Sequence, residues 1–154
     1  LPTTTIVKQI DISRLTADFS GTLLWCLGFP VSQKDLTLYL PSGSVEVYWG
    51  CSGIQSIWQL ITLAFLFLML FPLGWMRSLL LTLAGILIAF IVNGIRVVVM
   101  ALLVNQGNRP AFDYWHTGQG SLIFSMIAVG LFGGLCFFVL EQADNQSEDE
   151  EVEA

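Results

Sequence analysis

Three long stretches of apolar residues constrain the fold of this chain more than any other feature. They cover about residues 54–71, 78–104 and 117–140, and a helix needs roughly 20 such residues to cross a bilayer. Only 12% of the 154 residues are charged, which is about half the share typical of a soluble domain. The sequence therefore predicts an all-α integral membrane protein with three transmembrane helices.

The chain before the first span is more polar and predicts two smaller elements. Residues 14–28 carry apolar side chains at helical spacing: Leu15, Phe19, Leu23 and Cys26 or Leu27. This segment is too short and polar to span, so we expect a helix at the membrane surface. Residues 36–40 and 45–49 alternate with a period of two around the turn residues 41–44. They predict a short β-hairpin.

The last residues, 141–154, form a strongly acidic segment. Segments of this composition are usually solvated, so we expect a disordered tail. Arg77, in the turn 72–77, suggests that this turn is cytoplasmic by the positive-inside rule. The tail would then also be cytoplasmic, and the hairpin and the polar loop at 105–116 would face outward. The sequence has no basic stripe of the kind that binds nucleic acid.

Arg96 is unusual because it lies inside the second apolar stretch, where a charge is costly. It follows Asn93 by three residues, so both side chains share one helix face. Counted from Ser78 at about 1.5 Å per residue, Arg96 should lie just beneath the outer surface. The plainer interpretation is an arginine that reaches for the outer headgroups.

Cys51 and His116 are expected at the same face as Arg96. Cys51 precedes the first span, and a thiol at a helix N-terminus has a lowered pKa. A disulfide between Cys26 and Cys51 is the alternative. His116, the only histidine, is expected to open the third span, where an interfacial polar residue is more common than a catalyst. Cys136 is read as a packing residue.

These three residues together suggest a chemistry that none of them suggests alone. A thiol, an imidazole base and a fixed cation are the groups that acyl transfer through a thioester requires. Histidine can take the thiol proton, and arginine can stabilise the oxyanion of a tetrahedral intermediate. No Cys/His cluster with zinc spacing occurs, so we expect neither a metal nor a cofactor.

Several short motifs resemble the exosortase/archaeosortase family. They are Cys51-Ser52-Gly53-Ile54, Asn93-Gly94-Ile95-Arg96-Val97, His116 after a polar loop, and Leu27-Gly28-Phe29-Pro30-Val31 before the hairpin. The surroundings of His116 look similar to cyanobacterial members. The resemblance covers roughly residues 20–140.

The resemblance implies a cysteine transpeptidase-like enzyme of the cytoplasmic membrane, multi-pass, with its active site on the extracytoplasmic side. Cys51 corresponds to the nucleophile, Arg96 to the oxyanion-stabilising residue and His116 to the acid/base, with Asn93, Ser52 and Gly53 in support. The implied substrates are membrane proteins with a C-terminal sorting signal of the PEP-CTERM type: a short motif such as Pro-Glu-Pro, one transmembrane helix and a basic end. Exopolysaccharide-linked export is the typical setting.

The family usually carries further spans before the hairpin. Residues 1–140 are therefore expected to form one membrane-embedded catalytic domain that is incomplete at its N-terminus, followed by the tail at 141–154. A different class also fits the sequence: a non-catalytic assembly factor or small transporter subunit, with a structural disulfide between Cys26 and Cys51.

Overall fold

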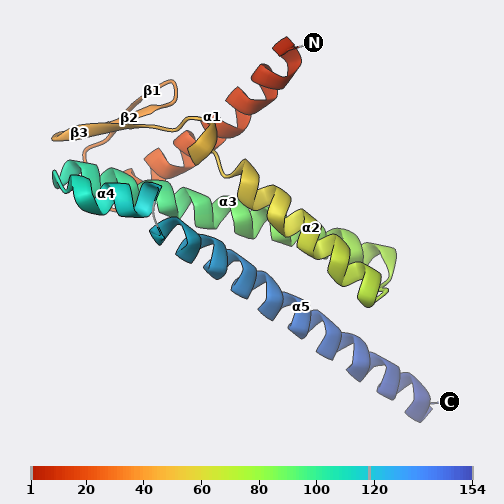
Figure 1. Cartoon of the computed structure of the whole chain (residues 1–154). Helices are drawn as coiled ribbons and strands as arrows, with labels where there is room; N and C mark the ends of the chain where they lie inside the picture. The colour runs from red at the N-terminus through yellow and green to blue at the C-terminus, as the bar shows by residue number, and fades with distance from the viewer. Residues whose placement is uncertain (1, 118, 154) are drawn as a thin grey trace.

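The computed structural model describes residues 2–117 and 119–153, and the side chains of residues 12–117, 119–143 and 145. This part of the chain is mainly helical, as predicted, and carries one small sheet (Figure 1). The elements are α1 (Pro2–Cys26), β1 (Ser32–Lys34), β2 (Thr37–Leu40), β3 (Gly43–Glu46), the 3₁₀ turn η1 (Trp49–Cys51), α2 (Ile54–Leu70), α3 (Trp75–Asn105), α4 (Arg109–His116) and α5 (Gly120–Glu153).

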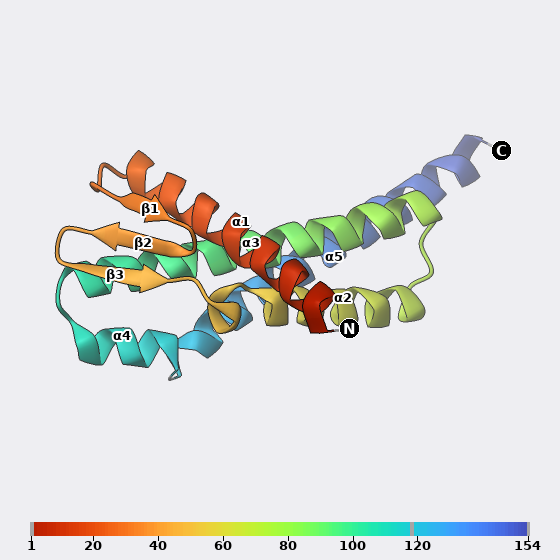
Figure 2. The same ribbon diagram turned by 90° about the horizontal axis from the view of Figure 1, so that it is seen from above.

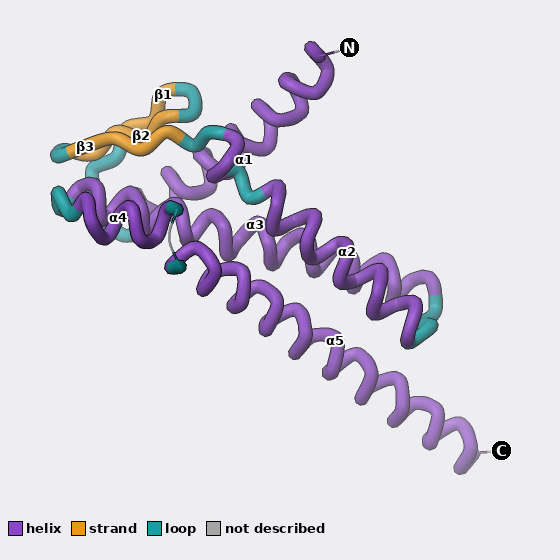
Figure 3. The backbone as a smooth tube through the Cα atoms, viewed as in Figure 1, coloured by secondary structure: helices purple, strands orange, loops and turns teal. Residues whose placement is uncertain are grey.

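Helices α2, α3 and α5 pack along a common direction and bury one apolar core between them (Figure 1). That core consists of Leu60, Ala64, Leu81, Ala89, Val92, Ala128, Phe132 and Cys136. The turn between α2 and α3 joins the ends of these two helices that point away from the sheet (Figure 3). Because the chain reverses there, the start of α2 and the C-terminal half of α3 lie at the other end, beside the sheet.

Two helices, α3 and the first part of α5 (Gly120–Ala143), are long and apolar enough to cross a membrane. Much of α5 is unburied: large apolar side chains such as Leu122, Met126 and Phe137 are exposed, as expected for a helix that faces lipid. Helix α2 is also apolar but has only 17 residues, or about 25 Å of helix. The predicted first span, about residues 54–71, therefore remains a prediction.

A second core covers the C-terminal part of α3, beyond Arg96. The residues there, Val97, Val98, Met100 and Ala101, pack against α1, the sheet and η1. Their buried partners are Ala17, Leu24, Leu38, Leu40, Val45, Val47 and Cys51. The apolar run after Arg96 is therefore covered by protein, whereas the sequence predicts that lipid covers it as part of the second span.

The predicted hairpin supplies two strands, β2 and β3, of a three-stranded antiparallel sheet. Strand β2 pairs with β3 in the register Leu38↔Val45, and β1 pairs with the other side of β2. Strand β1, Ser32–Lys34, has no apolar alternation that would reveal it. Strand β3 ends at Glu46, and the chain then turns into η1, so the predicted strand 45–49 is displaced. Figure 2 shows the sheet lying beside α1 over one end of α3.

Helix α1 buries a different face from the one predicted. The buried residues are small: Ser13, Thr16, Ala17, Ser20 and Gly21, with Leu24. Leu15, Cys26 and Leu27, which belong to the apolar face recognised in the sequence, are exposed. The close approach of α1 to α3 also depends on Gly94 of α3, because a Cβ there would lie only 2.3 Å from the Phe19 ring.

Two further boundaries differ from the prediction. The loop expected at 105–116 contains α4, whose first turn is capped by the Asn108 side chain accepting from the Ala111 amide. Helix α5 begins at Gly120 and continues to Glu153, through the segment predicted to be a disordered tail. The Glu, Gln and Ala residues that follow Leu140 are good helix formers, so the helix has no local reason to stop there.

Candidate active site

Cys51 is the last residue of η1, in the short connection between β3 and α2. Its side chain is buried, with 2% of its surface exposed. Gly53 follows with a φ of +83°, a left-handed conformation that favours glycine. A Cβ on Gly53 would also lie 2.7 Å from the Asn93 side chain. Gly53 is therefore needed twice, for the backbone turn and for the close approach to α3.

Two hydrogen bonds fix the backbone carbonyls of Cys51 and of the residue that follows it. The Asn93 side-chain amide donates to the Cys51 carbonyl at 2.8 Å, and the Thr16 hydroxyl donates to the Ser52 carbonyl at 3.0 Å. Asn93 is 3% exposed, so its bond is made away from water. The Ser52 hydroxyl donates to the Trp49 carbonyl, which closes η1 on itself. The thiol is thus held from both α1 and α3.

His116 faces the thiol from α4. Its Nε2 lies 3.4 Å from Cys51 Sγ, within hydrogen-bonding distance for sulfur. The prediction that His116 opens the third span is wrong, because it ends α4 and α5 begins at Gly120. The difference matters for geometry: the last turn of a separate short helix aims the imidazole back toward η1.

Arg96 joins the same group from α3. Its Nη2 donates to the His116 carbonyl at 2.9 Å, and its buried Nε has no hydrogen-bond partner among the described residues. A buried donor without a partner is costly, and such groups are rare in folded proteins. Arg96 therefore holds the end of α4 with one nitrogen and keeps another N–H group available close to Cys51 and His116.

Two aromatic residues complete the surroundings of His116, and neither was predicted as part of a site. The Phe112 ring stacks on the imidazole with 5.2 Å between centroids and 12° between planes. The Tyr48 hydroxyl lies 3.2 Å from Nε2, the nitrogen that also faces the thiol. The spacing carried a weak signal, since Phe112 precedes His116 by one helical turn and Tyr48 precedes Cys51 by three residues.

The electrostatics of the thiol differ from the prediction. Burial raises the pKa of Cys51 above its ordinary value, and the Arg96 guanidinium opposes part of that rise. A lowered pKa was expected from a helix N-terminus. Cys51, however, belongs to η1, and α2 begins three residues later at Ile54. At neutral pH the resting group is therefore a neutral thiol beside an imidazole.

We expect the alkylation of Cys51 to show this raised pKa directly. In a Cys26→Ser, Cys136→Ser background, the rate with iodoacetamide should rise with pH, because only the thiolate reacts. Its midpoint should lie above that of the same protein unfolded in denaturant, and Arg96→Gln should move it higher still. A folded-state midpoint below the unfolded one would contradict this assignment.

The thiols are not paired with one another. Cys26, Cys51 and Cys136 are all free; Cys26 is exposed at the end of α1, whereas Cys51 is buried against His116. The disulfide between Cys26 and Cys51, on which the non-catalytic alternative depended, is therefore absent from the structure. The same arrangement leaves Cys51 available for chemistry.

The arrangement contains the groups that attack on a carbonyl requires. Sγ is a nucleophile once its proton moves to Nε2, and the Arg96 guanidinium is the nearby cation that favours an anionic oxygen. The three residues come from three separate elements, η1, α3 and α4. The structure thus brings together Cys51, Arg96 and His116, and places Asn93, Ser52 and Gly53 in contact around them.

Comparison with known proteins gives one match. The model of a family described as transmembrane exosortase matches residues 1–133. No curated protein and no solved structure matches the chain. The match covers most of the 154 residues and includes α1, the sheet, η1, α2, α3 and α4. This membrane protein therefore belongs to the transmembrane exosortase family.

Proposed function

We propose that this protein is a membrane-embedded cysteine transpeptidase that cleaves C-terminal sorting signals of the PEP-CTERM type at the outer face of the cytoplasmic membrane. The observation that carries the proposal is the 3.4 Å approach of Cys51 Sγ to His116 Nε2, beside the Arg96 guanidinium. Family membership supports substrates that are themselves membrane proteins.

The reaction begins from the protonated thiol of Cys51. As Sγ attacks the scissile carbonyl carbon, the thiol proton moves to Nε2 of His116, and the carbonyl oxygen becomes an anion. The free N–H of Arg96 and its positive charge stabilise this oxygen. When the C–N bond breaks, the leaving amine takes the proton from Nε2 and the acyl group remains on Sγ as a thioester. Water or an amine then releases it.

The helix lengths support a site at the membrane surface. From Trp75 to Asn93, α3 rises about 27 Å, close to the roughly 30 Å of a bilayer's hydrocarbon core. Cys51 lies level with Asn93 because their hydrogen bond joins them. Beyond that level α3 is covered by the sheet and α1, so Arg96 would lie at the surface and not beneath it. A scissile bond next to the substrate's own span would reach this height.

Capture of the thioester tests the proposal. When the full chain is mixed with a sorting-signal substrate and quenched in acid, mass spectrometry should find an acyl adduct on the Cys51 peptide. Neutral hydroxylamine should remove it, because thioesters are labile to this nucleophile and ordinary amides are not. Cleavage with no adduct on Cys51, or with a stable adduct elsewhere, would contradict the mechanism.

A further inference from the structure

The free edge of the sheet leads directly to the thiol. Strand β3 is an outer strand of the order β1-β2-β3, and the chain runs from it through Tyr48 into η1 and Cys51. A pocket of about 480 Å³ lies where this edge begins, between the β2–β3 turn and α4. It is lined by Ser42, Ser44, Val104, Arg109, Phe112 and Asp113, among others.

The pairing of the sheet shows which backbone groups face this edge. The Val47 amide donates to the Leu36 carbonyl of the segment before β2. In an antiparallel ladder the bonded residues alternate, so Val45 and Gly43 also point toward β2. The N–H and C=O groups of Ser44 and Glu46 therefore point away from β2. The sheet pairs them with no strand in the described part of the chain.

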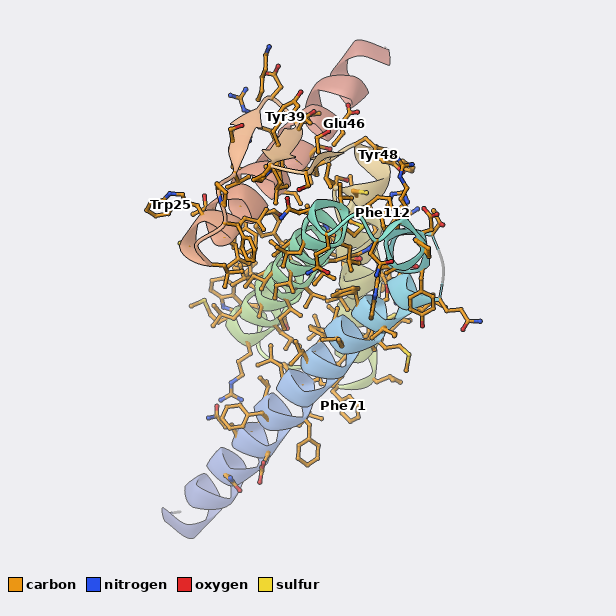
Figure 4. The ribbon with its side chains drawn as sticks, turned by 90° about the vertical axis from the view of Figure 1, so that its left-hand side faces the viewer. Trp25, Tyr39, Glu46, Tyr48, Phe71 and Phe112 are labelled. Carbon is orange, nitrogen blue, oxygen red and sulfur yellow. The ribbon has the colours of Figure 1, made fainter. Side chains whose placement is uncertain are left out.

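The pocket and the catalytic group share a wall. Phe112 lines the pocket and stacks on His116, and Tyr48 continues β3 and reaches the same imidazole. Figure 4 shows Glu46, Tyr48 and Phe112 near one another at the sheet end of the molecule, far from Phe71 at the opposite end. A chain lying along β3 would therefore continue to Cys51.

We infer that the motif of the sorting signal binds as an added strand on the free edge of β3, with its acidic residue against Arg109. This inference rests on the proposed function. The substrate's span follows its motif, so the peptide would run from the pocket toward the membrane and Cys51, in the same direction as β3. The added strand is therefore parallel to β3.

A Pro-x-Pro motif suits such an edge. In a parallel pair, one residue donates its N–H to one facing carbonyl of the neighbouring strand and accepts from the next facing N–H. The residue between the prolines would donate to the Ser44 carbonyl and accept from the Glu46 amide. Both prolines, which lack an N–H, then point their nitrogens away from β3, as edge prolines do.

The charge of the pocket selects the residue between the prolines. Arg109 is the cation that lines it, and it forms no ion pair among the described residues. It stands at the first position of α4, where a helix dipole disfavours a cation and favours an anion. Asp113 also lines the pocket, one turn further along. A glutamate in the motif would therefore form an ion pair with Arg109, and the negative charge of Asp113 would weaken its binding.

The test is binding of labelled motif peptides to the full chain in lipid nanodiscs, in a Cys51→Ala background so that no turnover competes. Arg109→Glu should weaken binding of the Pro-Glu-Pro peptide by about tenfold or more, the usual value of a charge-assisted hydrogen bond. The same variant should bind a Pro-Lys-Pro peptide more tightly than the parent protein does, because the charges of the pair are exchanged. Asp113→Asn should tighten binding of the Pro-Glu-Pro peptide, because it removes a negative charge from the pocket. Lys34→Gln, on the opposite edge of the sheet, is the matched control and should change nothing.

Glu46→Pro tests the strand itself. It removes the backbone N–H that faces the free edge. Binding should therefore fall both for Arg109 with the Pro-Glu-Pro peptide and for Arg109→Glu with the Pro-Lys-Pro peptide. The circular dichroism spectrum should stay the same as that of the parent protein. The inference is overturned if Arg109→Glu binds the Pro-Glu-Pro peptide normally, or if the Pro-Lys-Pro peptide gains nothing. Charge-switched binding with no cleavage by the unmodified protein would instead overturn the proposed function and leave this site standing.

Discussion

Replacing Cys51 with alanine is expected to abolish processing of a co-expressed sorting-signal substrate, by at least about 10⁴-fold, because no other described side chain can replace the nucleophile. His116→Ala should cost nearly as much, since the buried thiol has a raised pKa and needs a base to lose its proton. The double variant should be no worse than either single one, because the two residues act in one step. Immunoblots of precursor and product measure all three.

The other two cysteines provide the matched controls. Cys26 is exposed on α1 and Cys136 lies in the α2–α3–α5 core, so neither contacts His116. Cys26→Ala should process substrate like the unmodified protein, and a membrane-fraction blot should show equal insertion of every variant. Processing retained by Cys51→Ala, with normal insertion, would rule out the thioester mechanism.

Replacing Arg96 is expected to have the second-largest effect. Arg96→Ala removes both the cation near the developing oxyanion and the bond to the His116 carbonyl, and should lower kcat by about 10²–10³-fold. Arg96→Lys keeps the charge but has no planar fork, so it cannot hold His116 and present a second N–H in fixed geometry. We expect it to recover only a small part of the activity in the same immunoblot assay.

The lysine variant distinguishes charge from geometry. Near-normal processing by Arg96→Lys would mean that the residue supplies charge alone and that α4 needs no anchor. Arg14→Lys, an exposed arginine on α1, is the matched substitution and should have no effect. If Arg96→Ala itself processes substrate normally, the oxyanion role assigned to it is wrong.

The convergence of Cys51, Arg96 and His116 could be predicted from the sequence, because it follows from counting apolar stretches and chain reversals. Their chemical roles remain a proposal. The buried face of α1 could not be predicted in the same way. Hydrophobic periodicity finds a face only when that face is apolar, and α1 buries small residues: Ser20 against α3 and Gly21 against the sheet.

Helix α4 was missed for a related reason. Asn108 and Pro110 are ordinary signals for the start of a helix, but the nine residues between Gly107 and Thr117 are more simply interpreted as a loop. The surroundings of the residues after Arg96 could not be read from the sequence either, because apolar residues there suit lipid and a protein core equally well. Val97 and Met100 are buried by the sheet and α1, and only tertiary structure distinguishes these two environments.

The two reacting residues are both anchored to α3 through their backbone carbonyls, Cys51 by Asn93 and His116 by Arg96. Those anchors are three residues apart, about 4.5 Å along the helix axis. One turn of a single helix therefore acts as the common reference frame for nucleophile and base, although η1 and α4 belong to separate parts of the chain. Insertion of one residue between the anchors would rotate one of them by about 100° and separate the pair.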